Sequence, residues 1–131
     1  MELPSLLNVI PLYTAILGII FIVITARCGL YRAKSGVSMG DGGDDELLRR
    51  MRSQANFIES VPIALVLLVS MELSGASDTW LHSLGAALVV GRILHYLGLS
   101  GIGPGMLRPP GMILTLLPIL ISSIWLLAGL L

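Results

Sequence analysis

Four polar side chains at the start of one long apolar segment have the types and spacing of a binding site for a small charged molecule. They are Arg49, Arg52, Asn56 and Glu59. Because successive members are three or four residues apart, a helix that turns by about 100° per residue places them on one face. Burying Glu59 beside apolar residues costs free energy, which arginines one or two turns earlier can offset. The stripe is therefore either a buried ion-pair network or a site for a zwitterionic ligand. Gln54 falls on another face and is predicted to contact a different neighbour, such as another subunit.

A second polar group lies near the end of a later apolar segment. Arg92, His95 and Tyr96 share one face of the helix predicted there. We expect Arg92 to be a structural partner of Glu59 rather than a ligand contact. His95 and Tyr96 either contact a ligand or lie at the membrane interface.

The composition places the chain among membrane proteins. Of its 131 residues, 55% are hydrophobic and 12% are charged, and the mean hydropathy is +0.91. Eight basic and eight acidic side chains balance, so nothing in the charge points to nucleic acid. The single cysteine, Cys28, excludes an intrachain disulfide and a multi-thiolate metal site. The spacing of Asp41, Asp44 and Asp45 matches no EF-hand loop, so the sequence predicts no metal site.

Four apolar segments are long enough to cross a hydrocarbon core of roughly 30 Å as helices. The sequence predicts one all-α domain over residues 1–131, an integral membrane four-helix bundle with spans at about 4–27, 46–73, 79–98 and 109–131. The first span starts after an acidic residue and is too long for a signal peptide, so we expect it to remain in the mature protein. Pro11 either kinks this span or marks its true start. Pro62 can be tolerated inside the second span.

The connections between the spans differ in charge. Residues 28–45 are predicted to form a hydrated, glycine-rich loop in which Asp44 or Asp45 caps the next helix. All Lys and Arg residues flank the connections after spans one and three, whereas the turn after span two holds only acidic charges. By the positive-inside rule, both basic connections face the cytoplasm and both termini face the other way. Arg49 and Arg50 are then interpreted as anchors at the headgroup level, and the two polar groups lie at the same membrane face.

Two motifs resemble those of a known family. The second span carries R-x-Q-x-N-x-x-E-x-x-P, present as Arg52, Gln54, Asn56, Glu59 and Pro62, and the third carries G-R-x-x-H, present as Gly91, Arg92 and His95. Together they resemble the MAPEG family, the membrane-associated proteins in eicosanoid and glutathione metabolism, and the similarity in span count and loop order covers nearly the whole chain. The resemblance implies a bacterial-type inner-membrane protein that assembles as a homotrimer. It also implies that glutathione binds as co-substrate between neighbouring subunits, near the cytoplasmic side.

The resemblance assigns glutathione contacts to the first two spans. Arg52, Asn56 and Glu59 would hold the charged ends of glutathione, and Gln54 would either contact it or brace a neighbour. Arg27, at the end of the first span, matches a family arginine that also reaches glutathione. The assignments suit the ligand, because glutathione carries two carboxylates and one ammonium and guanidinium groups bind carboxylates bidentately.

The second and third spans keep only part of the family pattern. His95 stands where leukotriene-type members have a tyrosine and prostaglandin E-type members have a histidine, again in contact with glutathione. Ser60 and Leu99 replace two tyrosines of the leukotriene-type members. Tyr96 could supply one hydroxyl from the adjacent position.

The chemistry that the resemblance implies is attack by the glutathione thiolate on a hydrophobic, lipid-like electrophile that enters from the bilayer. A thiol with a pKa of about 8.5 is mostly protonated at neutral pH, so a cation must favour the thiolate. The family places an arginine near the start of the last helix for this role, and Arg108 is the matching catalytic candidate. One hypothesis is thus a membrane-bound glutathione transferase or peroxidase. The other is a non-catalytic scaffold that binds glutathione or a lipid and needs no cation beside the sulfur.

Overall fold

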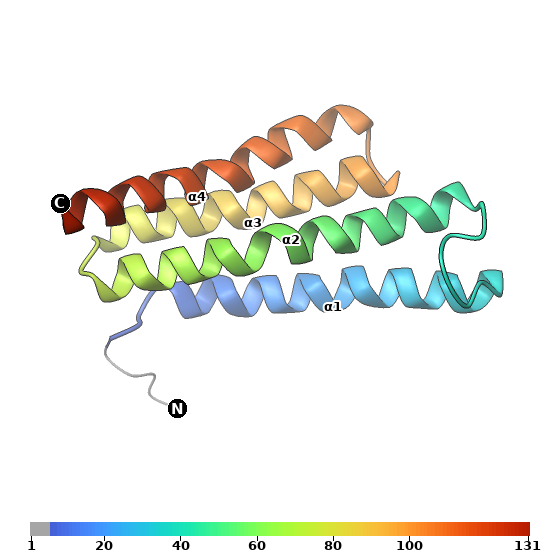
Figure 1. Cartoon of the computed structure of the whole chain (residues 1–131), viewed down its shortest axis with the longest axis horizontal. Coiled ribbons are helices and arrows are strands. Elements are labelled where there is room, and N and C mark those ends of the chain that lie inside the picture. The colour runs from blue at the N-terminus through green and yellow to red at the C-terminus, as the bar shows by residue number, and fades with distance from the viewer. Residues whose placement is uncertain (1–5) are drawn as a thin grey trace.

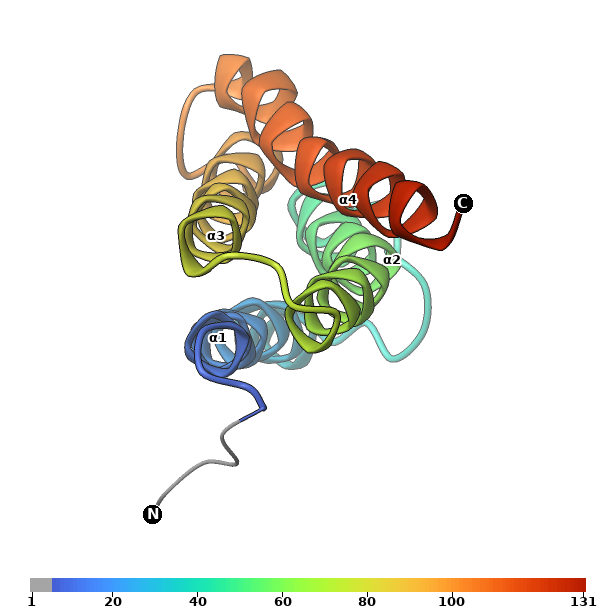
Figure 2. The ribbon, with the colours of Figure 1, turned by 90° about the vertical axis from the view of Figure 1, so that its left-hand side faces the viewer.

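A computed structural model describes residues 6–131, and this part of the chain contains four long helices and no strand. The helices are α1 (Ile10–Ser35), α2 (Asp45–Leu73), α3 (Asp78–Ser100) and α4 (Arg108–Leu130), with a short 3-10 helix, η1 (Gly105–Leu107), before α4. They run alternately up and down as a bundle (Figure 1), and α4 crosses the others at an angle in the end-on view (Figure 2). Each of the four is long and apolar enough to cross a membrane. The predicted all-α, four-helix fold is therefore confirmed.

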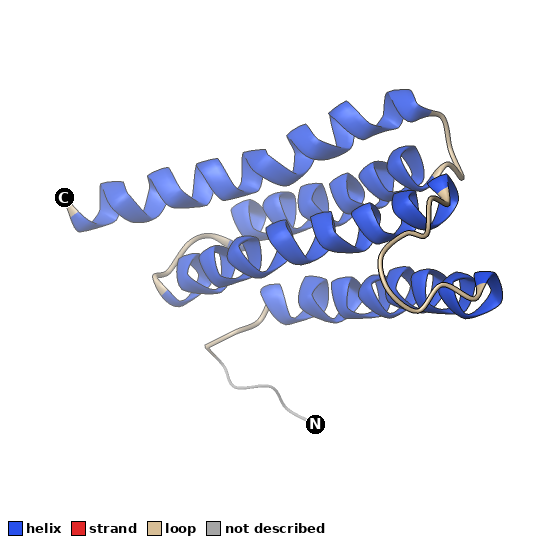
Figure 3. Ribbon diagram, turned by 45° about the vertical axis from the view of Figure 1, so that its right-hand side comes forward, coloured by secondary structure: helices blue, strands red, loops and turns tan. Residues whose placement is uncertain are grey.

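The first helix differs from the predicted span at both ends. Its predicted start near residue 4 lies outside the described residues, and the described helix begins at Ile10 with Pro11 in its first positions. Pro11 therefore marks the helix start rather than a kink, as its fixed backbone angle allows. At the other end, α1 continues to Ser35, well beyond Arg27, and stops where Gly36 adopts a left-handed conformation with φ of 72°. The loop predicted for residues 28–45 is correspondingly shorter (Figure 3).

The second helix starts and continues as the sequence predicts. The Asp44 carboxylate accepts a hydrogen bond from the backbone N–H of Leu47 at 3.0 Å, which makes Asp44 the N-cap. Pro62 lies inside α2 without ending it.

The start of α1 is capped by a side chain from the far end of α2. Helix α1 has no side-chain cap of its own. Instead, the Glu72 carboxylate accepts hydrogen bonds from the backbone N–H groups of Asn8, Val9 and Ile10 at 2.6, 2.7 and 2.9 Å. These amides would otherwise lack partners within the helix, and the negative charge also suits the positive end of the helix dipole.

We expect the Glu72→Gln variant to be less stable to unfolding than wild type by about 1–2 kcal/mol, because an amide replaces a carboxylate that accepts several hydrogen bonds. Thermal unfolding of the detergent-solubilised protein, followed by circular dichroism, measures the change. Asp78→Asn, which removes an exposed carboxylate beyond the adjoining turn, is the control. Equal melting temperatures for the two variants would contradict a capping role for Glu72.

Helices α3 and α4 touch through their backbones. A Cβ atom on Gly91 would lie 2.8 Å from the Leu114 Cβ and 2.9 Å from the Gly111 carbonyl oxygen, and one on Gly98 would lie 2.5 Å from the Arg108 nitrogen. Separations this short leave no room for a side chain. The three glycines Gly91, Gly98 and Gly111 therefore fix how closely the start of α4 approaches the end of α3.

Candidate functional site

Most of the sequence-predicted site residues lie toward one end of the bundle, where α1 and α3 end and α2 and α4 begin, whereas Glu59 lies midway along α2. We call that end of the bundle the basic end. An open pocket of about 560 Å³ lies there between α2, α3 and α4, and we call it the arginine pocket. It is lined by Leu48, Arg49, Arg52, Gly98, Leu99, Gly101, Gly103, Gly105 and Arg108. Three guanidinium groups thus surround one opening, and the glycines leave backbone rather than side chains on its wall.

A second pocket of about 390 Å³ lies on the other side of Arg49, and we call it the mixed-charge pocket. Its lining comes from α1, α2 and the end of α3 and consists of Arg27, Asp45, Glu46, Arg49, Ser100, Gly101 and Ile102. Arg49 and Gly101 belong to both linings, so the two pockets are neighbours. The Arg49 Nη1 lies 3.2 Å from the position that a Cβ on Gly101 would take.

Arg49, the first residue of the polar stripe predicted on the second span, lines both pockets. Its interpretation as an anchor at the headgroup level stays a prediction.

The polar stripe on α2 divides between the surface and the interior. Arg52 and Glu59 are more than half exposed, and the Arg52 Nη2 lies 4.0 Å from the Glu59 Oε2. Asn56 is half-buried and turns toward α3. In the single chain the stripe is thus not the buried ion-pair network that the sequence left open.

Arg92 is the centre of a buried polar cluster between α2, α3 and α4. Its side chain is 1% exposed, and its Nη2 donates to the Asn56 Oδ1 at 2.7 Å. Its Nη1 donates to the hydroxyl oxygens of Ser60 at 3.1 Å and Thr115 at 3.4 Å. The expected pairing of Arg92 with Glu59 is wrong, because α2 presents Asn56 and Ser60 to α3 and turns Glu59 outward.

His95 belongs to the same cluster. Its ring is 2% exposed, and its Nδ1 lies 3.3 Å from the Arg92 Nη2. Neither His95 nor Arg92 lines the two pockets at the basic end. The cluster therefore acts indirectly: it holds the Asn56 side chain in place and stabilises the packing of α3 against α2 and α4.

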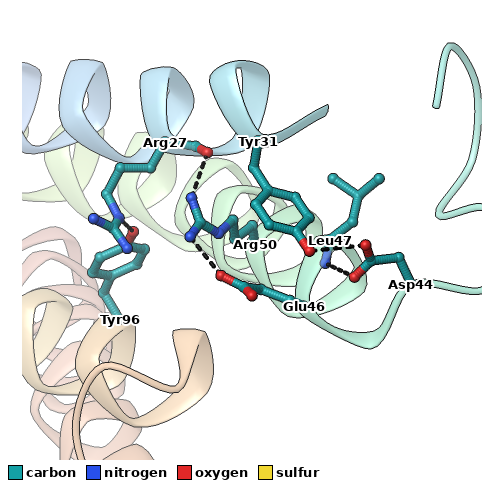
Figure 4. A network of polar contacts seen from close by, with 7 residues as sticks. All are labelled: Arg27, Tyr31, Asp44, Glu46, Leu47, Arg50 and Tyr96. Atoms are coloured by element: carbon teal, nitrogen blue, oxygen red, sulfur yellow. Dashed lines mark hydrogen bonds and ion pairs between the residues drawn. The ribbon is translucent and has the colours of Figure 1, made fainter. Parts of the chain in front are cut away.

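Tyr96 and Gln54 both make contacts with α1. The Tyr96 hydroxyl accepts a hydrogen bond from the Arg27 Nε at 2.7 Å (Figure 4). The Gln54 Nε2 donates to the Thr25 hydroxyl at 3.3 Å. Gln54 thus lies on a different face from the stripe, as predicted, but its contact here is within the same chain.

A network of side chains fastens the end of α1 to the start of α2 (Figure 4). The Arg50 Nη1 donates to the Arg27 carbonyl oxygen at 2.9 Å, and its Nη2 pairs with the Glu46 Oε1 at 2.6 Å. The Arg50 guanidinium also stacks over the Tyr31 ring, 4.5 Å from its centroid. Arg50 is therefore a structural residue that holds the backbone carrying Arg27.

Hydrogen bonds lower the pKa of Asp44 below its ordinary value of 3.8. The backbone N–H of Leu47 is the largest cause, and the Tyr31 hydroxyl, 2.8 Å from the Asp44 Oδ2, is the next. Both donate to the ionised form. A carboxylate with a lowered pKa in the folded state contributes stability that is complete above the unfolded pKa and is lost as the pH falls through the folded pKa.

We therefore expect wild type to be more stable than Asp44→Asn at pH 7, and the difference to shrink as the pH falls below about 4. Melting temperatures of both proteins in detergent between pH 7 and pH 3 measure it. A difference that stays constant over this range would show that the charge of Asp44 has no part in capping α2.

The family model described as "MAPEG family" matches residues 10–128 of the chain. Two curated relatives are named inner membrane protein YecN, from Escherichia coli strain K12 and from Escherichia coli O6:H1 strain CFT073. Each is 42% identical over 67 residues, which cover 51% of this chain and 51% of the relative. The matched segment thus spans about half the length of the curated relatives. No solved structure matches the chain significantly.

Proposed function

Because the chain belongs to the MAPEG family, we propose that it binds glutathione at the basic end and transfers it through its thiol to a hydrophobic electrophile. The protein is an integral membrane protein with four helices able to span the bilayer in its described part. The observation that supports the proposal most is the arginine pocket, in which Arg49, Arg52 and Arg108 line one opening. Glutathione has a carboxylate at each end, and guanidinium groups bind carboxylates through paired hydrogen bonds.

The proposed chemistry uses Arg108 beside the sulfur. Arg108 is exposed at the start of α4, and the absence of a side chain on Gly98 allows its backbone to touch α3. A guanidinium near the thiol favours the thiolate over the protonated form. The thiolate then forms a carbon–sulfur bond with the electrophile, whose leaving group departs with the bond's electron pair while the thiol proton goes to solvent.

We further propose that a homotrimer covers the exposed polar side chains of α2. Glu59 lies well inside a helix able to span the membrane, and its side chain is 59% exposed in the single chain. A charged side chain facing lipid costs several kcal/mol. A neighbouring subunit over Arg52 and Glu59 removes this cost and places the arginine pocket at a subunit boundary.

The proposed location is the bacterial inner membrane, which agrees with the name of the Escherichia coli relatives. The two basic connections are proposed to face the cytoplasm and both termini the periplasm. In this orientation the basic end opens toward the cytoplasm.

A non-catalytic scaffold that binds glutathione or a lipid is the second candidate. The position of His95 favours this candidate. The side chain is buried against Arg92 and does not line either pocket, so it is not placed to contact glutathione as the family resemblance implies. Turnover separates the two candidates, since both bind a ligand but only the transferase consumes it.

The first test is glutathione binding by the purified protein, measured by isothermal titration calorimetry. We expect Arg52→Ala to weaken binding by about 10–100-fold, because a hydrogen bond to a charged group contributes about 1.5–3 kcal/mol. Lys34→Ala, which removes an exposed positive charge from the end of α1 outside both pockets, is the matched control. If wild type does not bind glutathione, the proposed function is wrong.

A further inference from the structure

The arginines of the chain fall into two groups according to their partners. Four of them donate hydrogen bonds to other residues of the chain, and Figure 4 shows two of these, Arg27 and Arg50. The other two members of this group are Arg32 and Arg92. The second group consists of Arg49, Arg52 and Arg108, which are the arginines that line the arginine pocket.

The guanidinium groups of this second group are largely without partners. Among the described residues, Arg49 and Arg108 have no hydrogen bond or ion pair, and Arg52 has a single contact of 4.0 Å with the Glu59 carboxylate. No carboxylate belongs to the lining of the pocket. Like charges that share one opening raise the free energy of the folded chain, and a bound anion offsets this cost.

The wall of the pocket leaves these guanidinium groups accessible. All three arginines are exposed, and much of the wall is glycine. At Gly101 the backbone adopts a φ of 86°, and a Cβ atom there would lie 3.2 Å from the Arg49 Nη1. Glycine at this position therefore keeps the space beside the Arg49 guanidinium free for a ligand.

The pocket also lies where a lipid headgroup would lie. Arg49 and Arg52 are in the first turns of α2, and Arg108 is the first residue of α4, and both helices are able to span a membrane. The segment between α3 and α4, which forms part of the wall, carries Ile102 and Met106, which are 53% and 76% exposed. Exposed apolar side chains beside cations suit the boundary between hydrocarbon and headgroups, where basic pockets between helices bind lipid headgroups.

We propose that the arginine pocket binds a phosphate monoester group, as carried by an anionic lipid of the phosphatidic acid type, and that this group competes there with glutathione. A phosphate monoester carries a charge of about −1.5 to −2 at neutral pH and three acceptor oxygens, so it can engage several guanidinium groups at once. A carboxylate has fewer oxygens and less charge to share among them. Phosphate binding stands on the pocket alone, whereas the competition rests on the proposed function.

The direct test is isothermal titration calorimetry in a non-ionic detergent and a phosphate-free buffer, with a short-chain phosphatidic acid as the probe. We expect Arg49→Gln and Arg108→Gln each to weaken binding by about 10–100-fold, because each removes hydrogen bonds to a charged group. Neither variant loses a hydrogen bond of the described chain, so both should fold, and one folded variant is enough for the test. Lys34→Ala, which removes an exposed positive charge outside the pocket, should bind the probe as wild type does.

Two further probes define the group that is bound. Short-chain phosphatidylcholine, whose phosphate is a diester next to a choline cation, should not bind measurably. Inorganic phosphate separates the two sources of the group: tighter binding of phosphatidic acid indicates a lipid headgroup, and equal binding indicates a soluble phosphate ester. Either result supports the phosphate site if the arginine variants lose the binding.

The competition is measured by titrating wild type with glutathione in the presence of the probe. Phosphatidic acid at about ten times its dissociation constant should lower the apparent affinity for glutathione by about 10-fold. Glutathione affinity that does not change would overturn the shared pocket.

The outcomes separate this inference from the proposed function. Phosphate binding is overturned if wild type does not bind phosphatidic acid, if it binds phosphatidylcholine equally well, or if the arginine variants bind the probe as tightly as Lys34→Ala does. If wild type binds phosphatidic acid through these arginines but does not bind glutathione, the proposed function is wrong and the phosphate site stands.

Discussion

Replacing Gly111 with alanine is expected to push α4 away from α3 and to disable the basic end. A Cβ atom on Gly111 would collide with the backbone nitrogen of His95 and would lie 2.7 Å from the His95 Cα and 2.8 Å from the Gly91 carbonyl oxygen. These are backbone atoms of a helix and cannot turn aside as a flexible side chain does. Overpacking of this kind costs about 1–3 kcal/mol and occasionally more. Because Gly105 and Arg108, at the start of α4, form one wall of the arginine pocket, displacing this wall should also weaken glutathione binding.

Gly129→Ala is the matched control for this prediction. Gly129 lies on the same helix, and nothing lies within 4 Å of the position that its Cβ would take. Alanine is the better helix former by about 1 kcal/mol, so this variant should be as stable as wild type or more so. Thermal unfolding and calorimetric titration with glutathione, made on both variants, give the comparison. A Gly111→Ala protein as stable as Gly129→Ala would mean that the backbones of α3 and α4 are not in contact.

Replacing Arg108 with alanine is expected to lower the turnover of glutathione with a chlorinated nitroaromatic acceptor by about 100–1,000-fold. Removing one group that stabilises a developing or reacting anion typically has an effect of this size. The loss should fall on kcat, while the affinity for glutathione should change less because Arg49 and Arg52 still line the pocket. Arg108→Lys should recover part of the rate, since it keeps the charge but not the guanidinium.

Lys34→Ala again serves as the control, because it removes one positive charge from the same end of the bundle. Its turnover should equal that of wild type. If wild type shows no more turnover than Arg108→Ala while still binding glutathione, the transferase hypothesis fails and the scaffold hypothesis is favoured.

The spans could be predicted from the sequence because long apolar runs separated by charged connections define membrane-type helices on their own. The end of α1 could not be predicted in this way. Residues 28–35 contain charges that suggest a loop, yet they are compatible with a helix, and the helix stops at Gly36 rather than at Gly29. Which glycine adopts the left-handed conformation depends on the tertiary contacts of the loop, such as the hydrogen bond from the Arg32 Nη1 to the Gly40 carbonyl oxygen at 2.7 Å.

For the site, helical spacing predicted which side chains share a helix face. It did not predict which residues of the neighbouring helices contact that face. The rotation of α2 against α3 decides that Arg92 contacts Asn56 and not Glu59, and no spacing rule gives this rotation. Likewise, Arg49 lines two pockets because α1 and the end of α3 lie on either side of it, and helical spacing does not give the positions of these neighbours. The sequence did predict that the polar residues of α2 and α3 gather at one end, because alternating spans bring the second and third spans antiparallel.

The cap that Glu72 provides has a consequence for how the chain enters the bilayer during synthesis. The first amide groups of α1 find no partner within the helix, and the carboxylate that pairs with them comes from another helix. Glu72 lies at the end of α2 and is made after all of α1. The first helix is therefore completed only once the second has crossed the bilayer, so the two should leave the insertion machinery as a helical hairpin rather than one at a time.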